Sequence, residues 1–311
     1  MKFLVVLICV SVSYLWKRDR NRIDDTWFIK LREYIDKTTE GLEARSELVW
    51  VLGLLLIYFV PMGVVAGLLF LSGGVFFGLL TMLIHILVLL MAFDLIHPGL
   101  LAQGYLERWN KMDLQACFLY LKEDLRCGPV PEDFIGLHKT FCRVYIYRCF
   151  EKMFVMFFWY VLAGPLGLMF AYVCYQHRDG DMRQRNGKET GIVSKLIEML
   201  EWIPVRLLGF TMSLVGDFES CFYRLRRTGL INELATDTTI YEYSFCALGL
   251  SSTDSTAQKP EGHESAVDNS GFEQFKEQGA LEVSALQSLM ERSQISWLCL
   301  MALITVLGLG V

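Results

Sequence analysis

Residues 48–71 read LVWVLGLLLIYFVPMGVVAGLLFL, and this stretch decides the class of the chain. An apolar run of about 20 residues is the length needed to cross the hydrocarbon core of a bilayer as a helix. An uncharged Ser-Gly-Gly turn follows at 72–74, and residues 75–96 form a second apolar run. Pro61 fits this interpretation because proline is tolerated in membrane helices. The two runs therefore predict a transmembrane hairpin over residues 48–96.

The composition of the whole chain favours the same class. Hydrophobic residues make up 53% of the chain and charged residues 20%, whereas soluble domains are about one quarter charged and below about half apolar. The net charge is −5, and no basic arm with interleaved aromatics indicates nucleic-acid binding. We therefore expect an all-α, polytopic helical membrane protein with cytoplasmic amphipathic helices and the lipid bilayer as its main partner.

Hydropathy and charge divide the chain into segments of different character. They are an N-terminal anchor (1–16), a cytoplasmic amphipathic segment (17–47), the hairpin (48–96), a cytoplasmic helical region (97–152), a transmembrane or re-entrant span (153–175), a further helical region (176–250), a flexible linker (251–278), and a short helix followed by a C-terminal anchor (279–311). The linker is predicted because its polar sequence has almost no aliphatic residues to offset the entropy of ordering.

Within the first cytoplasmic segment, one helix face is apolar. Trp27, Leu31, Tyr34 and Ile35 follow the spacing of a single helix face. Such a stripe suits a helix lying along the inner membrane surface. Packing of the same stripe on neighbouring protein is an equally good explanation.

The topology of the C-terminal half is left open by the sequence. The basic cluster at 17–22 predicts a cytoplasmic side for the end of the first segment. If every later span crossed fully, the basic residues from Arg178 to Lys195 would lie outside, against the positive-inside rule. Either the span at 153–175 bends at Gly164-Pro165 and re-enters, or the first segment does not cross.

The cysteines are scattered singly along the chain. They form no Cys-x-x-Cys pair, and no His lies at zinc-ligand spacing from a cysteine pair. Several lie in or against apolar segments, where cysteine packs as a small hydrophobic side chain. We therefore expect reduced packing cysteines, no disulfide framework and no metal site.

The most informative polar string is LEWIPVRL at 200–207. A guanidinium among aliphatic residues is costly in lipid unless it pairs or reaches the headgroups, and Pro204 frees backbone carbonyls nearby. One interpretation is a buried Arg206 paired with Glu198 or Glu201; the other is an interfacial helix whose arginine reaches the headgroups. The candidate functional motif is Glu201, Trp202, Pro204 and Arg206, with Glu198 as a secondary candidate.

Two further ionisable residues are secondary candidates. His85 lies in the middle of the second hairpin run, where a histidine is either functional or hydrogen-bonded across helices. Asp94 lies near the end of that run, where ionisable groups commonly reach water. The sequence has no phosphate-binding loop and no nucleophile elbow, and its spans carry too few paired charges to favour a transporter. We therefore assign no catalytic residue and expect no cofactor.

The motif string also carries a family resemblance. LIEMLEWIPVRLLGFTMSLVGDFE (196–219) resembles the signature stretch of the AmpE family of bacterial membrane proteins. Three other features agree in order and spacing: the Asp-Thr-Trp-Phe at 25–28, the span MFFWYVLAGPLGLMFAYV at 156–173, and the apolar C-terminal tail. The resemblance covers nearly the whole chain outside the linker.

The AmpE family is similar in turn to the CobD/CbiB cobinamide-phosphate synthases, which form an amide bond. Ile203, Pro204 and Arg206 match their Ile-Pro-x-Arg stretch. Those enzymes also have an acidic Glu-Asn and Asp signature upstream, where this chain has only Glu151. This departure argues against transferring the enzymatic activity or a catalytic role for Arg206.

The resemblance implies a regulatory protein of the bacterial inner membrane, associated with β-lactamase induction and cell-wall recycling, with a protein partner in that pathway. The alternative is a membrane-bound amide-forming ligase that binds an anionic substrate near Arg206.

Overall fold

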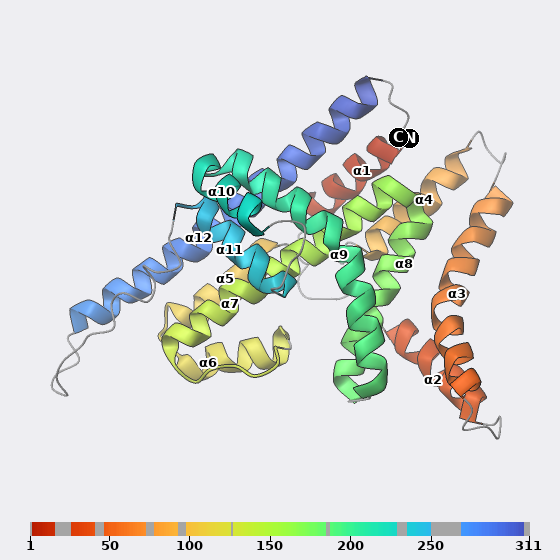
Figure 1. The fold of residues 1–311 in the computed structure, drawn as a ribbon, viewed down its shortest axis with the longest axis horizontal. Helices are drawn as coiled ribbons and strands as arrows, with labels where there is room; N and C mark the ends of the chain where they lie inside the picture. The colour runs from red at the N-terminus through yellow and green to blue at the C-terminus, as the bar shows by residue number, and fades with distance from the viewer. Residues whose placement is uncertain are drawn as a thin grey trace. The chain divides into compact units, whose positions relative to one another are not determined.

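The computed structural model describes residues 2–15, 26–40, 47–72, 78–92, 98–125, 127–184, 187–228, 235–249 and 269–307. Every regular element within these ranges is a helix, so the predicted all-α class is confirmed there (Figure 1). The chain forms two compact units. The first comprises Met1–Ile96, Lys152–Trp202 and Met301–Val311, and the second His97–Glu151 and Ile203–Leu300.

The first unit is built around helix α8. Its helices are α1 (Lys2–Leu15), α2 (Thr26–Glu40), α3 (Glu47–Ser72), α4 (Leu79–Ala92), α8 (Met156–Gln184) and the first part of α9 (Gly187–Val215). Helix α8 packs against both α3 and α4, while α1 packs on α4 and α2 on α3. The fully buried side chains of this unit include Leu89, Tyr160 and Tyr172.

Helix α2 decides between the two interpretations of its apolar stripe. Its contact with α3, and the stacking of Trp27 on Tyr172 with ring centroids 6.3 Å apart, place the stripe on neighbouring protein. Tyr34 was wrongly included in the stripe, because it is 71% exposed. Phe28 and Arg32, which the pattern did not include, are buried instead.

Helix α8 is interrupted where the sequence predicted. Gly164 has φ 68° and ψ −156°, outside the helical region, and Pro165 follows it. Proline disfavours helical geometry in the residue before it, and only glycine adopts a positive φ at little cost. The predicted interruption at Gly164-Pro165 is therefore confirmed.

The second unit is a cluster of shorter helices with one long helix. These are α5 (Pro98–Trp109), α6 (Leu114–Leu119), the π-helix η2 (Tyr120–Asp124), α7 (Phe134–Cys149), α10 (Phe218–Thr228), α11 (Thr236–Ala247) and most of α12 (Asn269–Val306). Helix α7 packs on α5, α6 and α11, and α10 packs on α11. The helical stretch ends at Asp124. Asp133 caps α7 by accepting a hydrogen bond from the Gly136 N–H at 2.8 Å.

Helix α12 begins earlier than the sequence predicted. Residues 269–278 were expected in the flexible linker, but they form its first turns. The reason is Trp109: its indole N–H donates to the Lys276 carbonyl at 3.0 Å, and its ring lies 5.6 Å from that of Phe275. The predicted short helix and C-terminal anchor are likewise one continuous helix. Residues 251–268 of the linker lie outside the described residues.

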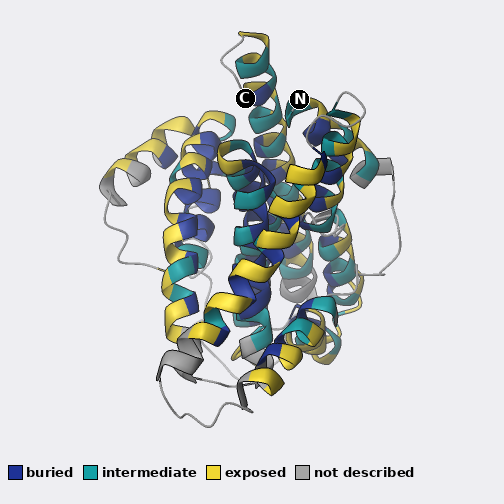
Figure 2. Cartoon of the chain, turned by 90° about the vertical axis from the view of Figure 1, so that its right-hand side faces the viewer, coloured by how far each residue is buried: buried dark blue, intermediate teal, exposed yellow. Residues whose placement is uncertain are grey.

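Three helices are long and apolar enough to cross a membrane: Leu52–Ser72, Phe134–Gly180 and Gln274–Val306. The second combines α7, the π-helix η3 (Phe150–Val155) and most of α8. The apolar helices Lys2–Val12 and Leu79–Ala92 are shorter. Many large apolar side chains are exposed on these helices; exposed residues are yellow in Figure 2.

Candidate functional site

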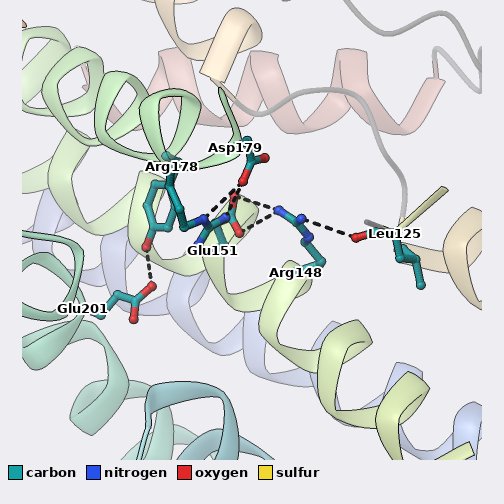
Figure 3. Close-up of polar contacts among 7 residues, drawn as sticks. Leu125, Arg148, Glu151, Arg178, Asp179 and Glu201 are labelled. Atoms are coloured by element: carbon teal, nitrogen blue, oxygen red, sulfur yellow. Dashed lines mark hydrogen bonds and ion pairs between the residues drawn. The ribbon is translucent and has the colours of Figure 1, made fainter. Parts of the chain in front are cut away.

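The predicted motif residue Glu201 lies in the core of the first unit. Its side chain is only 2% exposed, and it accepts a hydrogen bond of 2.7 Å from the Tyr175 hydroxyl on α8 (Figure 3). A buried carboxylate needs such partners, because removing it from water is otherwise costly. Sequence reasoning did not predict Tyr175 as this partner.

Charged side chains on α8 extend the same group. Arg178 lies one turn beyond Tyr175 on the helix, and its guanidinium is 4.9 Å from the centre of the Tyr175 ring. Its Nε and one terminal nitrogen donate to Asp179 at 3.1 and 3.0 Å. We call Tyr175, Arg178, Asp179 and Glu201 the α8–α9 cluster (Figure 3).

A second arginine reaches the same end of α8. Arg32 of α2 is buried, and one of its terminal nitrogens lies 3.2 Å from where a Cβ on Gly180 would stand. Arg32 therefore brings a second guanidinium group close to the end of α8 that carries Arg178 and Asp179.

Pro204 has the local effect that the sequence predicted. Because proline lacks an N–H, it cannot bond the carbonyl of Leu200, four residues earlier in α9. The Trp159 indole N–H of α8 donates to that carbonyl at 3.2 Å. The proline therefore creates an acceptor through which α8 holds α9 just before Glu201.

The remaining motif residues have different environments. Trp202 and Glu198 are exposed, while Pro204 is buried and Arg206 is half-buried. Burial lowers the pKa of Arg206 below its ordinary value, and nearby Tyr243 partly offsets this shift. The pairing of Arg206 with Glu198 or Glu201 stays a prediction.

Of the secondary candidates, His85 has a clear partner. Its Nδ1 lies 3.1 Å from the Tyr160 hydroxyl, and the two rings meet edge to face. This is the hydrogen bond across helices that is the ordinary alternative to a functional intramembrane histidine. Asp94 lies outside the described residues.

In the second unit, Glu151 is fully buried and forms an ion pair with Arg148, 3.1 Å away (Figure 3). A terminal nitrogen of Arg148 also donates to the Leu125 carbonyl at 3.5 Å. Glu151 is the second residue of the π-helix η3, a geometry that is often found at functional sites. Glu151, the carboxylate noted in this region of the sequence, is thus paired with a partly buried guanidinium group.

Another group in the second unit offers metal-binding atoms. His138, Cys142 and Glu282 each bring one ligand atom to within 4.8 Å of the other two. The hydroxyl of Tyr105 lies 3.2 Å from His138 Nδ1. Burial raises the pKa of Tyr105, and of Tyr241 on α11, so both hydroxyls stay protonated. Sequence reasoning missed this group, although the spacing of His138 and Cys142 places both on one helix face.

These features define a class of protein. The regular elements of its described residues are all helices, and three of these helices are long and apolar enough to cross a membrane.

The comparison with protein families identifies the family. Residues 4–225 match the family described as regulatory signalling modulator protein AmpE, so the chain belongs to the AmpE family and is a regulatory signalling modulator. The match includes the α8–α9 cluster, His138 and Cys142, but not Glu282. No curated protein and no solved structure matches the chain. Nothing in these comparisons supports the ligase alternative or a relation to the cobinamide-phosphate synthases.

Proposed function

We propose that this AmpE-family chain is a multi-pass protein of the bacterial inner membrane that modulates β-lactamase induction and cell-wall recycling through a protein partner in that pathway. The family match over residues 4–225 carries the proposal. That stretch includes two of the three helices long enough to span a membrane, and it includes the α8–α9 cluster.

The exposed surface of α3 supports a membrane location. Phe70 is 86% exposed, and Phe59, Val64 and Leu68 are exposed on the same helix. Soluble monomers rarely expose apolar patches of more than a few hundred Å², whereas lipid is a favourable environment for such a surface. Lys and Arg residues flanking the apolar segments would then face the cytoplasm.

The α8–α9 cluster is the part of the chain we assign to signalling. Ionisable residues at membrane depth are expensive, so such a residue is by default a candidate for a functional role. Here Glu201 and Tyr175 join α9 to α8 close to the Trp159–Leu200 contact that Pro204 makes available. A partner that shifts α9 would have to break these contacts, so the cluster can set the balance between two positions of the helix.

A charge on the exposed face of α3 tests the membrane location. Val64→Asp should reduce the membrane-inserted fraction, because Asp at the centre of a membrane helix costs about 2.5–3.5 kcal/mol on insertion scales. Tyr34→Asp, an exposed site on α2, should leave insertion unchanged. Both fractions are measured by carbonate extraction of membranes. Equal extraction of Val64→Asp and the unaltered chain would contradict the proposed span.

The signalling role is tested by β-lactamase induction in cells that carry the chain as their only copy. Glu201→Gln should change the induced β-lactamase level several-fold at an equal amount of membrane protein, while Glu33→Gln, at an exposed position of α2, should not. The induced β-lactamase level of Arg206→Ala tests the second charged residue of the motif in the same way. Unchanged induction would show that Arg206 has no role in signalling. If deletion of the whole chain leaves induction unchanged, the β-lactamase proposal itself is wrong.

A further inference from the structure

The strongest unassigned group of side chains in the molecule lies between α7 and α12 of the second unit. His138 and Cys142 are one turn apart on α7, and Glu282 comes from α12. The distance from His138 Nε2 to Cys142 Sγ is 3.5 Å, and from His138 Nε2 to Glu282 Oε2 it is 3.6 Å. One ring nitrogen therefore faces both a thiol and a carboxylate.

These separations match the edges of a metal coordination polyhedron. Zinc binds sulfur at about 2.3 Å, imidazole nitrogen at about 2.0–2.1 Å and carboxylate oxygen at about 2.0–2.2 Å, with tetrahedral angles. Those bond lengths place a nitrogen and a sulfur ligand about 3.6 Å apart and a nitrogen and an oxygen ligand about 3.4 Å apart. The third separation, between Cys142 Sγ and the Glu282 carboxylate oxygen, is at most 4.8 Å.

The three side chains of this group are coupled pairwise. His138 Nε2 lies within reach of both Cys142 and Glu282, and Cys142 also forms a side-chain hydrogen bond with Glu282. A metal ion would bind all three atoms at once. The Tyr105 hydroxyl, 3.2 Å from His138 Nδ1, then accepts from Nδ1–H and fixes the ring, as the outer partners of metal-bound histidines do.

We propose that His138, Cys142 and Glu282 bind a zinc ion. Three protein ligands leave the fourth tetrahedral position to water or to another ligand. Cys142 is fully buried, whereas the Glu282 side chain is 18% exposed, which gives the ion a path from solvent. Binding releases the thiol proton to water, because the metal ligand is the thiolate.

The site would link a part of the chain that matches the AmpE family to a part that lies beyond the match. His138 and Cys142 lie within the stretch that matches the AmpE family, and Glu282 lies beyond it. Zinc would therefore fasten the long C-terminal helix to the family-matched helix α7. This inference is independent of the proposed role in β-lactamase induction.

Metal content and cobalt spectroscopy on the full chain in mild detergent test the site. After exposure to zinc and removal of excess by desalting, the unaltered chain should retain equimolar zinc. His138→Gln and Cys142→Ser should lose it, and Glu282→Gln should weaken zinc affinity by at least tenfold. Tyr105→Phe should lower zinc affinity by about 10–100-fold, as loss of an outer partner does. In place of zinc, cobalt(II) should give a thiolate-to-metal charge-transfer band.

Matched controls come from the same two helices. Cys149→Ser replaces another buried cysteine of α7, and Glu291→Gln another glutamate of α12; both should keep equimolar zinc and the cobalt band. The proposal is overturned if the unaltered chain retains no equimolar metal, or if Cys142→Ser and Glu282→Gln bind zinc as it does. If a variant misfolds, the charge-transfer band of the unaltered chain with cobalt still tests the proposal. Its presence supports a thiolate ligand, and its absence overturns the proposed site.

Discussion

Removal of the Tyr175 hydroxyl is the sharpest test of the α8–α9 cluster. Tyr175→Phe keeps the ring under the Arg178 guanidinium, so it isolates the 2.7 Å hydrogen bond to Glu201. Hydrogen bonds to charged groups contribute about 1.5–3 kcal/mol, and Glu201 has almost no access to water that could replace the lost donor. We therefore expect a loss of about 2 kcal/mol in the free energy of unfolding, about 30-fold in the equilibrium constant.

The assay is reversible unfolding of the full chain in mixed detergent–SDS micelles, followed by far-ultraviolet circular dichroism. Tyr223→Phe, at an exposed position of α10, is the matched control and should stay within about 0.5 kcal/mol of the unaltered chain. In a double-mutant cycle with Glu201→Gln, the two changes should be non-additive by more than about 0.5 kcal/mol. A loss below about 0.5 kcal/mol for Tyr175→Phe, or additive effects in the cycle, would refute the assignment.

Further predictions are measured by the same unfolding assay. Gly216→Ala should lower the free energy of unfolding by about 1–3 kcal/mol, because its Cβ would meet the backbone carbonyl of Ala247, which cannot rotate away. Gly191→Ala, in helix α9 with open space around it, should instead raise the free energy of unfolding by up to about 1 kcal/mol. Thr211→Val should cost about 1 kcal/mol, because the Trp297 indole N–H donates to the Thr211 hydroxyl at 2.8 Å; a cost near zero would show that Trp297 has an equivalent acceptor.

The features predicted correctly from the sequence are those that depend on local pattern. The apolar run at 48–71 predicted helix α3, because length and hydropathy are properties of a continuous segment. The interruption at Gly164-Pro165 followed from the backbone limits of two adjacent residues. The same apolar stretch explains why Glu201 is buried, and its role in signalling stays a prediction.

The features missed depend on contacts between distant segments. The first turns of α12 are polar in sequence, and only Trp109, more than 150 residues earlier, explains why they are helical. The partner of Glu201 is a tyrosine on another helix, and a tyrosine inside an apolar run carries no sign of its hydrogen bond. Glu282 likewise becomes a candidate ligand only because α12 packs close to His138 of α7, which the sequence does not show.

Arg178 shows how a sequence rule can misjudge a charge whose contacts appear only in the structure. In the basic stretch from Arg178 to Lys195 it counted as a free charge against a fourth span that crosses fully, because the positive-inside rule weighs loop charges near the ends of spans. In the structure α8 continues past it, and its guanidinium bonds Asp179 and covers the Tyr175 ring. A charge paired and partly desolvated in this way is weak evidence about the side of a loop. Arg178 is thus better explained as part of the α8–α9 cluster than as a loop charge. The positive-inside objection to a fully crossing α8 therefore has one charge fewer to support it.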